Sequence, residues 1–77
     1  MKSRVKLYRE EAGMTQKELA GYVGVARRTI NALENGKYNP SLMLAYRITI
    51  FLGYNNIHDV FRFEKEDLEN KKKKQEQ

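Results

Sequence analysis

Two adjacent arginines, Arg27 and Arg28, follow a glycine-containing turn and begin a stretch with a helical pattern of apolar residues. An arginine can bond to guanine O6 and N7 together, which is the commonest specific contact between a protein and a DNA base. Asn31 lies one helical turn beyond Arg27 and offers both a donor and an acceptor, which suits adenine. The pattern predicts base contacts. The alternative is that both arginines are solvated or bind only phosphate.

The residues before the arginines predict a helix that would position them. Thr15 and Glu18 form a T-x-x-E capping box, which is the sharpest local signal for a helix start in this chain. The helix is expected to extend to about Val23. Gly24 breaks it, because glycine freely adopts the positive φ of a tight turn.

The second of these two helices is expected near residues 26–35, with Ile30 and Leu33 facing the core. Two short helices joined by a short glycine-containing turn fit the helix-turn-helix motif, which here covers about residues 15–35. In that motif the second helix lies in the DNA major groove, and its N-terminal residues contact the base edges.

Three further helices complete the predicted domain. Ser3 can cap a first helix, and Ser41 can cap a fourth helix, expected over residues 42–52. Asn56 can cap a fifth, short helix over residues 57–61. The predicted fold class is therefore all-α, a compact five-helix domain.

The C-terminal part of the chain combines a weak strand signal with a charged tail. Residues 61–64 alternate between apolar and charged side chains, so a short C-terminal β-strand is an option at the end of a domain that covers residues 1–63. Residues 64–77 are polar and are expected to be flexible. The run from Lys71 to Lys74 resembles a nuclear-localisation or phosphate-binding run, but the acidic residues around it favour a solvated tail.

The net charge of +5 is concentrated in the predicted domain. Residues 64–77 hold five basic and five acidic residues, so the whole net charge falls on residues 1–63. A folded body with this basic balance indicates a polyanionic partner such as nucleic acid. The alternative is ordinary charge that keeps the protein soluble.

The composition argues against an enzyme, a metal site or a membrane protein. The chain of 77 residues is long enough for one small domain, and it has no cysteine and a single histidine, His58. It shows no pair of carboxylates framed by apolar residues, so we expect neither catalysis nor a metal or cofactor. No apolar run approaches the roughly 20 residues of a membrane span, and no secretory signal begins the chain. The expected location is the cytoplasm, in association with the nucleoid.

Residues 4–61 resemble the helix-turn-helix family of phage Cro and repressor proteins (XRE-like regulators), and above all its compact bacterial single-domain members. The family pattern TQ-x-x-LA, VGV, TI-x-x-LENGKY-x-PSL is highly specific, whereas the capping box alone would be weak. The resemblance implies a lambda-repressor-like DNA-binding domain. It rests on Arg9, Met14-Thr15-Gln16, Leu19-Ala20, Val23-Gly24-Val25, Thr29-Ile30, Leu33-Glu34-Asn35-Gly36-Lys37-Tyr38, Pro40-Ser41-Leu42, Ala45, Ile48 and Leu52.

The resemblance also implies roles for individual positions. Arg27 and Arg28 match positions that contact bases, and Arg9 with Glu34 matches an ion pair that holds the helices together and does no chemistry. Gln16 matches a glutamine that anchors to the DNA backbone and supports the recognition helix. The full set of expected phosphate contacts is Gln16, Lys17, Thr29, Asn35, Lys37 and Tyr38.

One position departs from the family pattern. Ala26 stands where members usually carry a Ser or Thr that caps the recognition helix. Loss of a capping hydroxyl typically costs about 0.5–2 kcal/mol. Ala26 can instead contact a thymine methyl group, so it is an expected base contact.

The predicted fourth helix and the residues after it carry more apolar side chains than a monomer of this size can bury. A contiguous exposed patch usually marks an interface, so we expect a homodimer with two-fold symmetry. The alternative is that these side chains fill a loose core. The expected interface residues are Met43, Tyr46, Ile50, Tyr54, Ile57, Phe61 and Phe63.

Together these features predict a sequence-specific regulator of transcription that binds double-stranded DNA, acts as a repressor, and pairs on an inverted-repeat operator with half-sites about 34 Å apart. No small-molecule ligand is indicated. The rival hypothesis is an antitoxin or adaptor module that mainly binds a partner protein. The two arginines, and the absence of acidic residues other than the capping Glu18 from Thr15 to Asn31, favour DNA.

Overall fold

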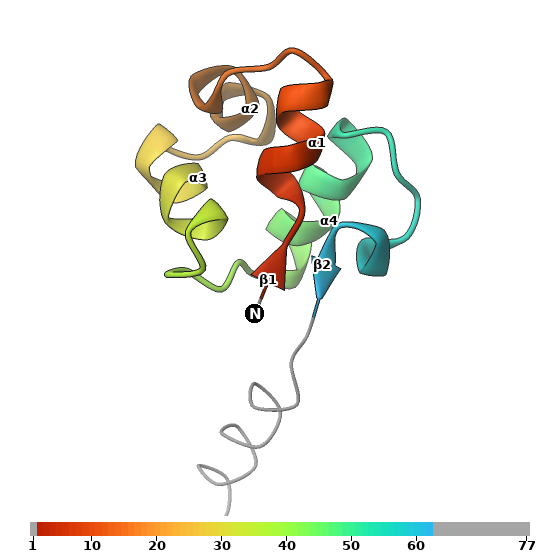
Figure 1. Ribbon diagram of the computed structural model, residues 1–77. Coiled ribbons are helices and arrows are strands. Elements are labelled where there is room, and N and C mark those ends of the chain that lie inside the picture. The colour runs from red at the N-terminus through yellow and green to blue at the C-terminus, as the bar shows by residue number, and fades with distance from the viewer. Residues whose placement is uncertain (1, 63–77) are drawn as a thin grey trace, which may run out of the picture.

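The computed structural model describes residues 2–62 and places four α-helices, one short 3₁₀ helix and two strands along the chain (Figure 1). None of the helices within that range is both long and apolar enough to cross a bilayer. In chain order the elements are β1 (Lys2–Ser3), α1 (Val5–Glu11), α2 (Gln16–Val23), α3 (Arg27–Glu34), α4 (Leu42–Phe51), η1 (Ile57–Asp59) and β2 (Phe61–Arg62).

Local sequence signals set most helix boundaries as predicted. The Thr15 hydroxyl accepts a hydrogen bond from the Glu18 amide at 3.0 Å, and the Glu18 carboxylate accepts one from the Thr15 amide at 2.9 Å. This is the complete capping box. At the other end of α2, Gly24 has a φ of 81°, which a side chain would make unfavourable. Ser41 caps α4 through the Leu44 amide.

The core lies between α2, α3 and α4, with contributions from the start of α1 and from the C-terminal segment (Figure 1). Thr49 is the one fully buried polar side chain of α4, and its hydroxyl donates to the Ala45 carbonyl at 2.8 Å, so its burial leaves no orphaned group. The buried apolar residues are Val5, Leu19, Ala20, Val23, Ile30, Leu33, Leu44, Ala45, Ile48, Leu52, Val60 and Phe61.

The two ends of the described chain pair with each other, which corrects the prediction for Ser3. β1 and β2 run antiparallel, with Lys2 opposite Arg62 and Ser3 opposite Phe61. Ser3 therefore lies in a strand and not at a helix cap, and α1 begins after Arg4 without a side-chain cap. Two-residue strands show no periodicity, so the N-terminal strand could not be predicted from the sequence.

The predicted fifth helix is present only as the 3₁₀ turn Ile57–Asp59. Asn56 caps this turn as expected, because its side-chain oxygen accepts from the His58 amide at 2.9 Å. The helix cannot continue to residue 61, since Phe61 and Arg62 are extended and pair with β1. The domain is thus mostly helical with a small two-stranded sheet, and five α-helices are not confirmed. Residues 63–77, including the predicted tail, lie outside the described part.

Phe61 and Phe51 offer a matched pair for testing the core. Phe61 is fully buried, whereas Phe51 is 49% exposed and stacks on Tyr22. We expect Phe61→Ala to lower the free energy of unfolding by about 3–5 kcal/mol. Phe51→Ala should lower it by about 1 kcal/mol or less, because it loses one surface stack. Urea unfolding followed by circular dichroism measures both. Equal losses would contradict the assignment of Phe61 to the core.

Candidate nucleic-acid interface

Helix α3 buries one side and exposes the other. Ile30 and Leu33 are at most 2% exposed and fix the inner face. At 100° per residue, four exposed side chains then share the outer face, with Asn31 near its centre. These side chains are Arg27, Arg28, Asn31 and Asn35.

The N-terminus of α3 lacks a side-chain cap, as the alanine at position 26 predicted. Ala26 has extended backbone angles, and its carbonyl accepts the first hydrogen bond of the helix, from the Thr29 amide at 3.0 Å. The start of the helix is instead held by packing, because Val25 contacts the core just before it. The two arginines occupy the first two helical positions, where backbone N–H groups are free and the helix dipole is positive.

The predicted contact between Arg9 and Glu34 is present and joins α1 to the end of α3. Arg9 Nε lies 2.7 Å from Glu34 Oε2, and Arg9 Nη2 lies 3.2 Å from Glu34 Oε1, so the guanidinium binds the carboxylate with two parallel bonds. The third nitrogen, Nη1, donates to the Met14 carbonyl at 2.7 Å. The two side chains are only 9% and 2% exposed.

This ion pair holds both charges in a nearly dry environment. The hydrogen bonds that Arg9 donates to the Glu34 carboxylate raise the pKa of Arg9 above its already high value, so the guanidinium stays charged throughout the pH range in which proteins fold. Because either charge would be costly to bury alone, the pair orients α1 relative to α3.

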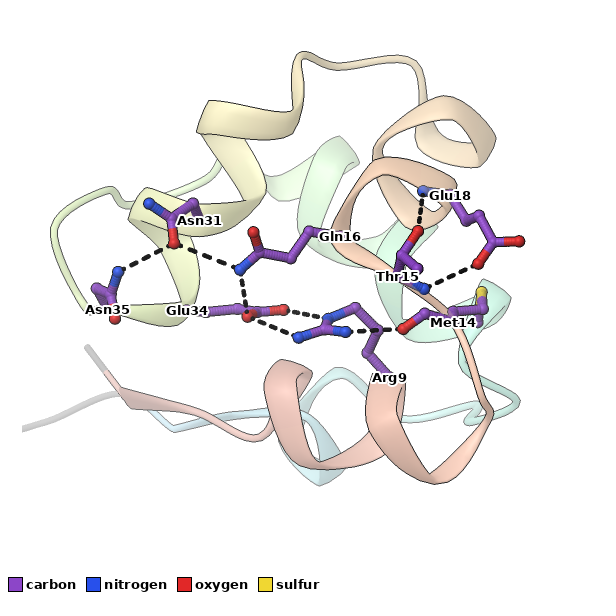
Figure 2. Close-up of polar contacts among 8 residues, drawn as sticks. All are labelled: Arg9, Met14, Thr15, Gln16, Glu18, Asn31, Glu34 and Asn35. Carbon is purple, nitrogen blue, oxygen red and sulfur yellow. Dashed lines mark hydrogen bonds and ion pairs between the residues drawn. The ribbon is translucent and has the colours of Figure 1, made fainter.

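Figure 2 shows that a chain of side-chain hydrogen bonds runs from this ion pair to the exposed face of α3. Gln16, the first residue of α2, donates from Nε2 to Glu34 Oε1 at 2.9 Å and to Asn31 Oδ1 at 3.3 Å. Asn35 Nδ2 also donates to Asn31 Oδ1, at 3.3 Å. The expected supporting role of Gln16 therefore has a geometric basis: its amide connects α2 to the outer face of α3.

The N-terminal ends of α2 and α3 flank an open hollow of about 510 Å³. Its lining includes Gln16, Lys17 and Arg27. The backbone amides of Gln16 and Lys17 belong to the first turn of α2, where no hydrogen-bond acceptor within residues 2–62 reaches them. The lining also includes Arg9, which is paired with Glu34, and the carboxylate of Glu10. The free amides, together with the cationic side chains of Lys17 and Arg27, make the side of the hollow next to the N-terminal ends of α2 and α3 suited to an anion.

The other expected phosphate contacts lie around the C-terminal end of α3. Asn35, Lys37 and Tyr38 are exposed in the segment that follows the helix, and Thr29 is half-buried. The Lys37 amide donates to the Ala32 carbonyl at 2.8 Å, which closes the end of α3 and fixes the path of this segment. Tyr38 is 40% exposed.

A second surface consists of apolar residues on α4. Met43, Tyr46 and Ile50 are 60%, 49% and 43% exposed and lie on one side of the helix, as predicted. Together with Leu42, which is 75% exposed, they form what we call the α4 apolar face. Ile57 lines a shallow hollow of about 460 Å³ beside this face.

Three other residues of the predicted dimer interface lie elsewhere. Phe61 is fully buried and offers no surface, because it pairs with β1 and its side chain belongs to the core. The ring of Tyr54 stacks on Tyr8 of α1 with centroids 4.3 Å apart, so it is half-buried within the chain. Phe63 lies outside the described residues.

A metal site is not formed by the described residues, since no three His, Asp or Glu side chains among residues 2–62 converge. His58 and Asp59 lie in the 3₁₀ turn, and both residues are exposed.

Comparisons with known proteins identify the family. A helix-turn-helix family model, HTH_3, matches residues 5–55. The chain belongs to the Cro/repressor-type (XRE-like) helix-turn-helix family. A family relative from Archaeoglobus fulgidus, an uncharacterised HTH-type transcriptional regulator, is 52% identical over 68 residues, which are 88% of this chain and 94% of the relative.

Solved structures of the regulator SinR share the fold. SinR in complex with DNA has a TM-score of 0.65 and 32% identity, over 71% of this chain and 87% of that chain. A complex of SinR protein with SinI protein has a TM-score of 0.69 and 29% identity, over 92% of this chain and 69% of that chain.

The hydrogen-bonded chain through Gln16, Asn31 and Asn35 was not predicted from the sequence. Asn31 and Asn35 are one helical turn apart, but Gln16 is separated from Asn31 by a helix and a turn. The sequence did hold a signal for this contact. Gln16 is a polar residue at the first position of α2, and Asn31 is a polar residue on the outer face of α3, so the two can face each other once the ion pair is formed. The stack of Tyr22 on Phe51 was likewise missed.

The ion pair can be tested by comparing single and double substitutions. Arg9→Met leaves the Glu34 carboxylate buried without its cation, so the free energy of unfolding should fall by about 3–5 kcal/mol. Glu34→Met should have a similar effect. The double substitution removes both charges and should recover most of the loss, as measured by urea unfolding. Additive losses in the double variant would contradict the coupling.

Proposed function

We propose that this family member binds double-stranded DNA sequence-specifically as a homodimer and represses transcription from an inverted-repeat operator. The observation that carries the proposal is the outer face of α3. This face presents Arg27, Arg28 and Asn31 to solvent, and a buried ion pair holds it in place. A helix of this kind fits the major groove, which is about 12 Å wide. The likeness to SinR bound to DNA supports this docking mode.

Base contacts are assigned to the N-terminal half of α3. Arg28 and Asn31 point away from the core, and Arg28 can bond bidentately to guanine. Arg27 lines the hollow beside α2 and can reach either a base or the neighbouring phosphate. Ala26, exposed at the start of the helix, can contact a thymine methyl group.

Phosphate contacts are assigned to both ends of the motif. Both Gln16 side-chain hydrogens are already engaged, so its backbone amide, with Lys17, is the donor to a phosphate at the start of α2. The remaining phosphate contacts would come from α3 and the segment that follows it, through Thr29, Asn35, Lys37 and Tyr38. These contacts fix the position of the protein on the duplex and carry no sequence information.

Dimerisation is assigned to the α4 apolar face. Exposed Met, Tyr and Ile side chains on one side of a helix are unusual for a small monomer, and self-association would cover them. Two-fold symmetry would place two copies of α3 in successive turns of the major groove, about 34 Å apart. A dimer bound in this way excludes other proteins from the same duplex, which is the simplest form of repression.

Selection of bound duplexes from a random pool at physiological salt tests the specificity. We expect enrichment of an inverted repeat whose arms are about 10 base pairs apart. Arg28→Ala should reduce affinity for the selected operator by about 1–3 kcal/mol and relax the preference at one base pair. The matched substitution Lys37→Ala should instead weaken binding to all sequences alike. Equal effects of both substitutions on specific and non-specific DNA would reduce Arg28 to a phosphate contact.

The dimer is tested by sedimentation equilibrium at micromolar concentration, where the unmodified chain should be dimeric. Tyr46→Lys places a charge in the α4 apolar face and should yield a monomer. Tyr22→Lys is the control, since Tyr22 is exposed to a similar extent but lies on α2. A monomeric unmodified chain, or dissociation by the control alone, would rule out this interface.

An adaptor that binds a partner protein is the second candidate. The structure of SinR with SinI is the observation that favours it, together with the α4 apolar face. Salt distinguishes the two candidates. Binding of DNA weakens steeply as salt rises, because bound counterions are released, whereas an apolar protein interface is much less sensitive.

A further inference from the structure

We infer that the buried ion pair sets which atoms of Asn31 face the DNA, so that Asn31 presents hydrogen-bond donors only and favours guanine at the base that it contacts. The inference rests on the proposed function. It replaces the expectation from the sequence that Asn31 is suited to adenine through both a donor and an acceptor.

The chain of causes begins at Glu34. Its carboxylate is bound by the Arg9 guanidinium through two hydrogen bonds and is almost fully buried. A carboxylate in such a pair is ionised and can only accept hydrogen bonds. Any group that contacts Glu34 Oε1 besides Arg9 must therefore be a donor.

The Glu34 carboxylate fixes the orientation of the Gln16 side-chain amide. The nitrogen and oxygen of a side-chain amide are told apart by the groups they contact. The end of Gln16 that lies 2.9 Å from Glu34 Oε1 must be the NH₂ group, because its oxygen would meet an oxygen there. The same nitrogen lies 3.3 Å from Asn31, so both Gln16 hydrogens are used.

Gln16 in turn fixes the orientation of the Asn31 side-chain amide. Since Gln16 approaches with a donor, the facing atom of Asn31 must be its oxygen. Asn35 Nδ2 donates to that same oxygen at 3.3 Å, which occupies its second lone pair (Figure 2). No group among residues 2–62 accepts a hydrogen bond from the Asn31 NH₂, so both of its hydrogens are free.

The consequence for base recognition follows from the pattern of the major groove. Guanine offers two acceptors there, O6 and N7, whereas adenine offers one acceptor beside a donor, and cytosine offers a donor only. A donor-only Asn31 satisfies guanine best and is opposed by cytosine. To bind adenine bidentately, Asn31 would have to turn its oxygen outward, which breaks two bonds and sets its NH₂ against the NH₂ of Gln16.

The test uses the full chain and the operator obtained by selection. Asn31→Ala identifies the base pair that Asn31 contacts, as the position where preference is lost. Affinity is then measured for duplexes with each of the four bases at that position. The unmodified protein should favour guanine over adenine by about fivefold or more. Equal or tighter binding to adenine would overturn the inference.

Two variants test the cause of the preference. Gln16→Met combined with Asn35→Ala removes both donors from the Asn31 oxygen, so the amide can turn and adenine should bind as well as guanine. Lys17→Met is the matched control on the same turn of α2; it should weaken all duplexes and leave the guanine-to-adenine ratio unchanged. Circular dichroism verifies that the variants fold. An unchanged ratio in the double variant would also overturn the inference.

Asn31→Asp reverses the hydrogen-bonding character without changing the shape of the side chain. Its inner oxygen can still accept from Gln16 and Asn35, while the outer oxygen now presents an acceptor. The preferred base should change from guanine to cytosine or adenine, with weaker binding overall because of the added negative charge. A retained guanine preference would contradict the inference.

Two outcomes with the unmodified protein separate the inference from the proposed function. Failure to select any duplex would overturn the proposed function, and the base preference with it. A specific operator with adenine at the position that Asn31 contacts would overturn the inference alone.

Discussion

The buried pair of Arg9 and Glu34 is the interaction on which the geometry of the outer surface depends. One guanidinium bonds to the carboxylate of α3 and to the Met14 carbonyl before α2, so three segments meet at a single side chain. Two charges in a nearly dry site are stable only together and in the right geometry. The pair therefore does more than add stability: it fixes where α3 lies relative to α1 and α2.

The direction of hydrogen bonding spreads outward from this pair. An acceptor-only carboxylate orients Gln16, which orients Asn31, and the exposed face of α3 thus acquires a definite pattern of donors. On α4 the inner side is packed into the core, and the outer side carries the α4 apolar face beside the exposed Arg47. The small domain thereby presents a polar surface on α3, which we propose enters the DNA groove, and an apolar surface on α4, which we propose pairs with a second copy.

Much of this arrangement could be predicted from the sequence because the signals were local. The capping box at Thr15 and Glu18 set the start of α2, and the periodicity of Ile30 and Leu33 set the inner face of α3. The ion pair could be predicted only through the family resemblance. The burial of Phe61 and the pairing of β1 with β2 were missed, because contacts between distant two-residue strands leave no periodic pattern. The orientations of the Gln16 and Asn31 amides could not be predicted either, because each depends on neighbours that are close only in the folded chain.

The most direct test of the account is the NMR relaxation of the side-chain NH₂ groups of Gln16 and Asn31 in the free protein. If the ion pair fixes both amides, their order parameters should approach the value of rigid backbone, about 0.85. Glu34→Met should then release both groups. Order parameters below about 0.6 in the unmodified protein would show freely moving amides and would contradict the account.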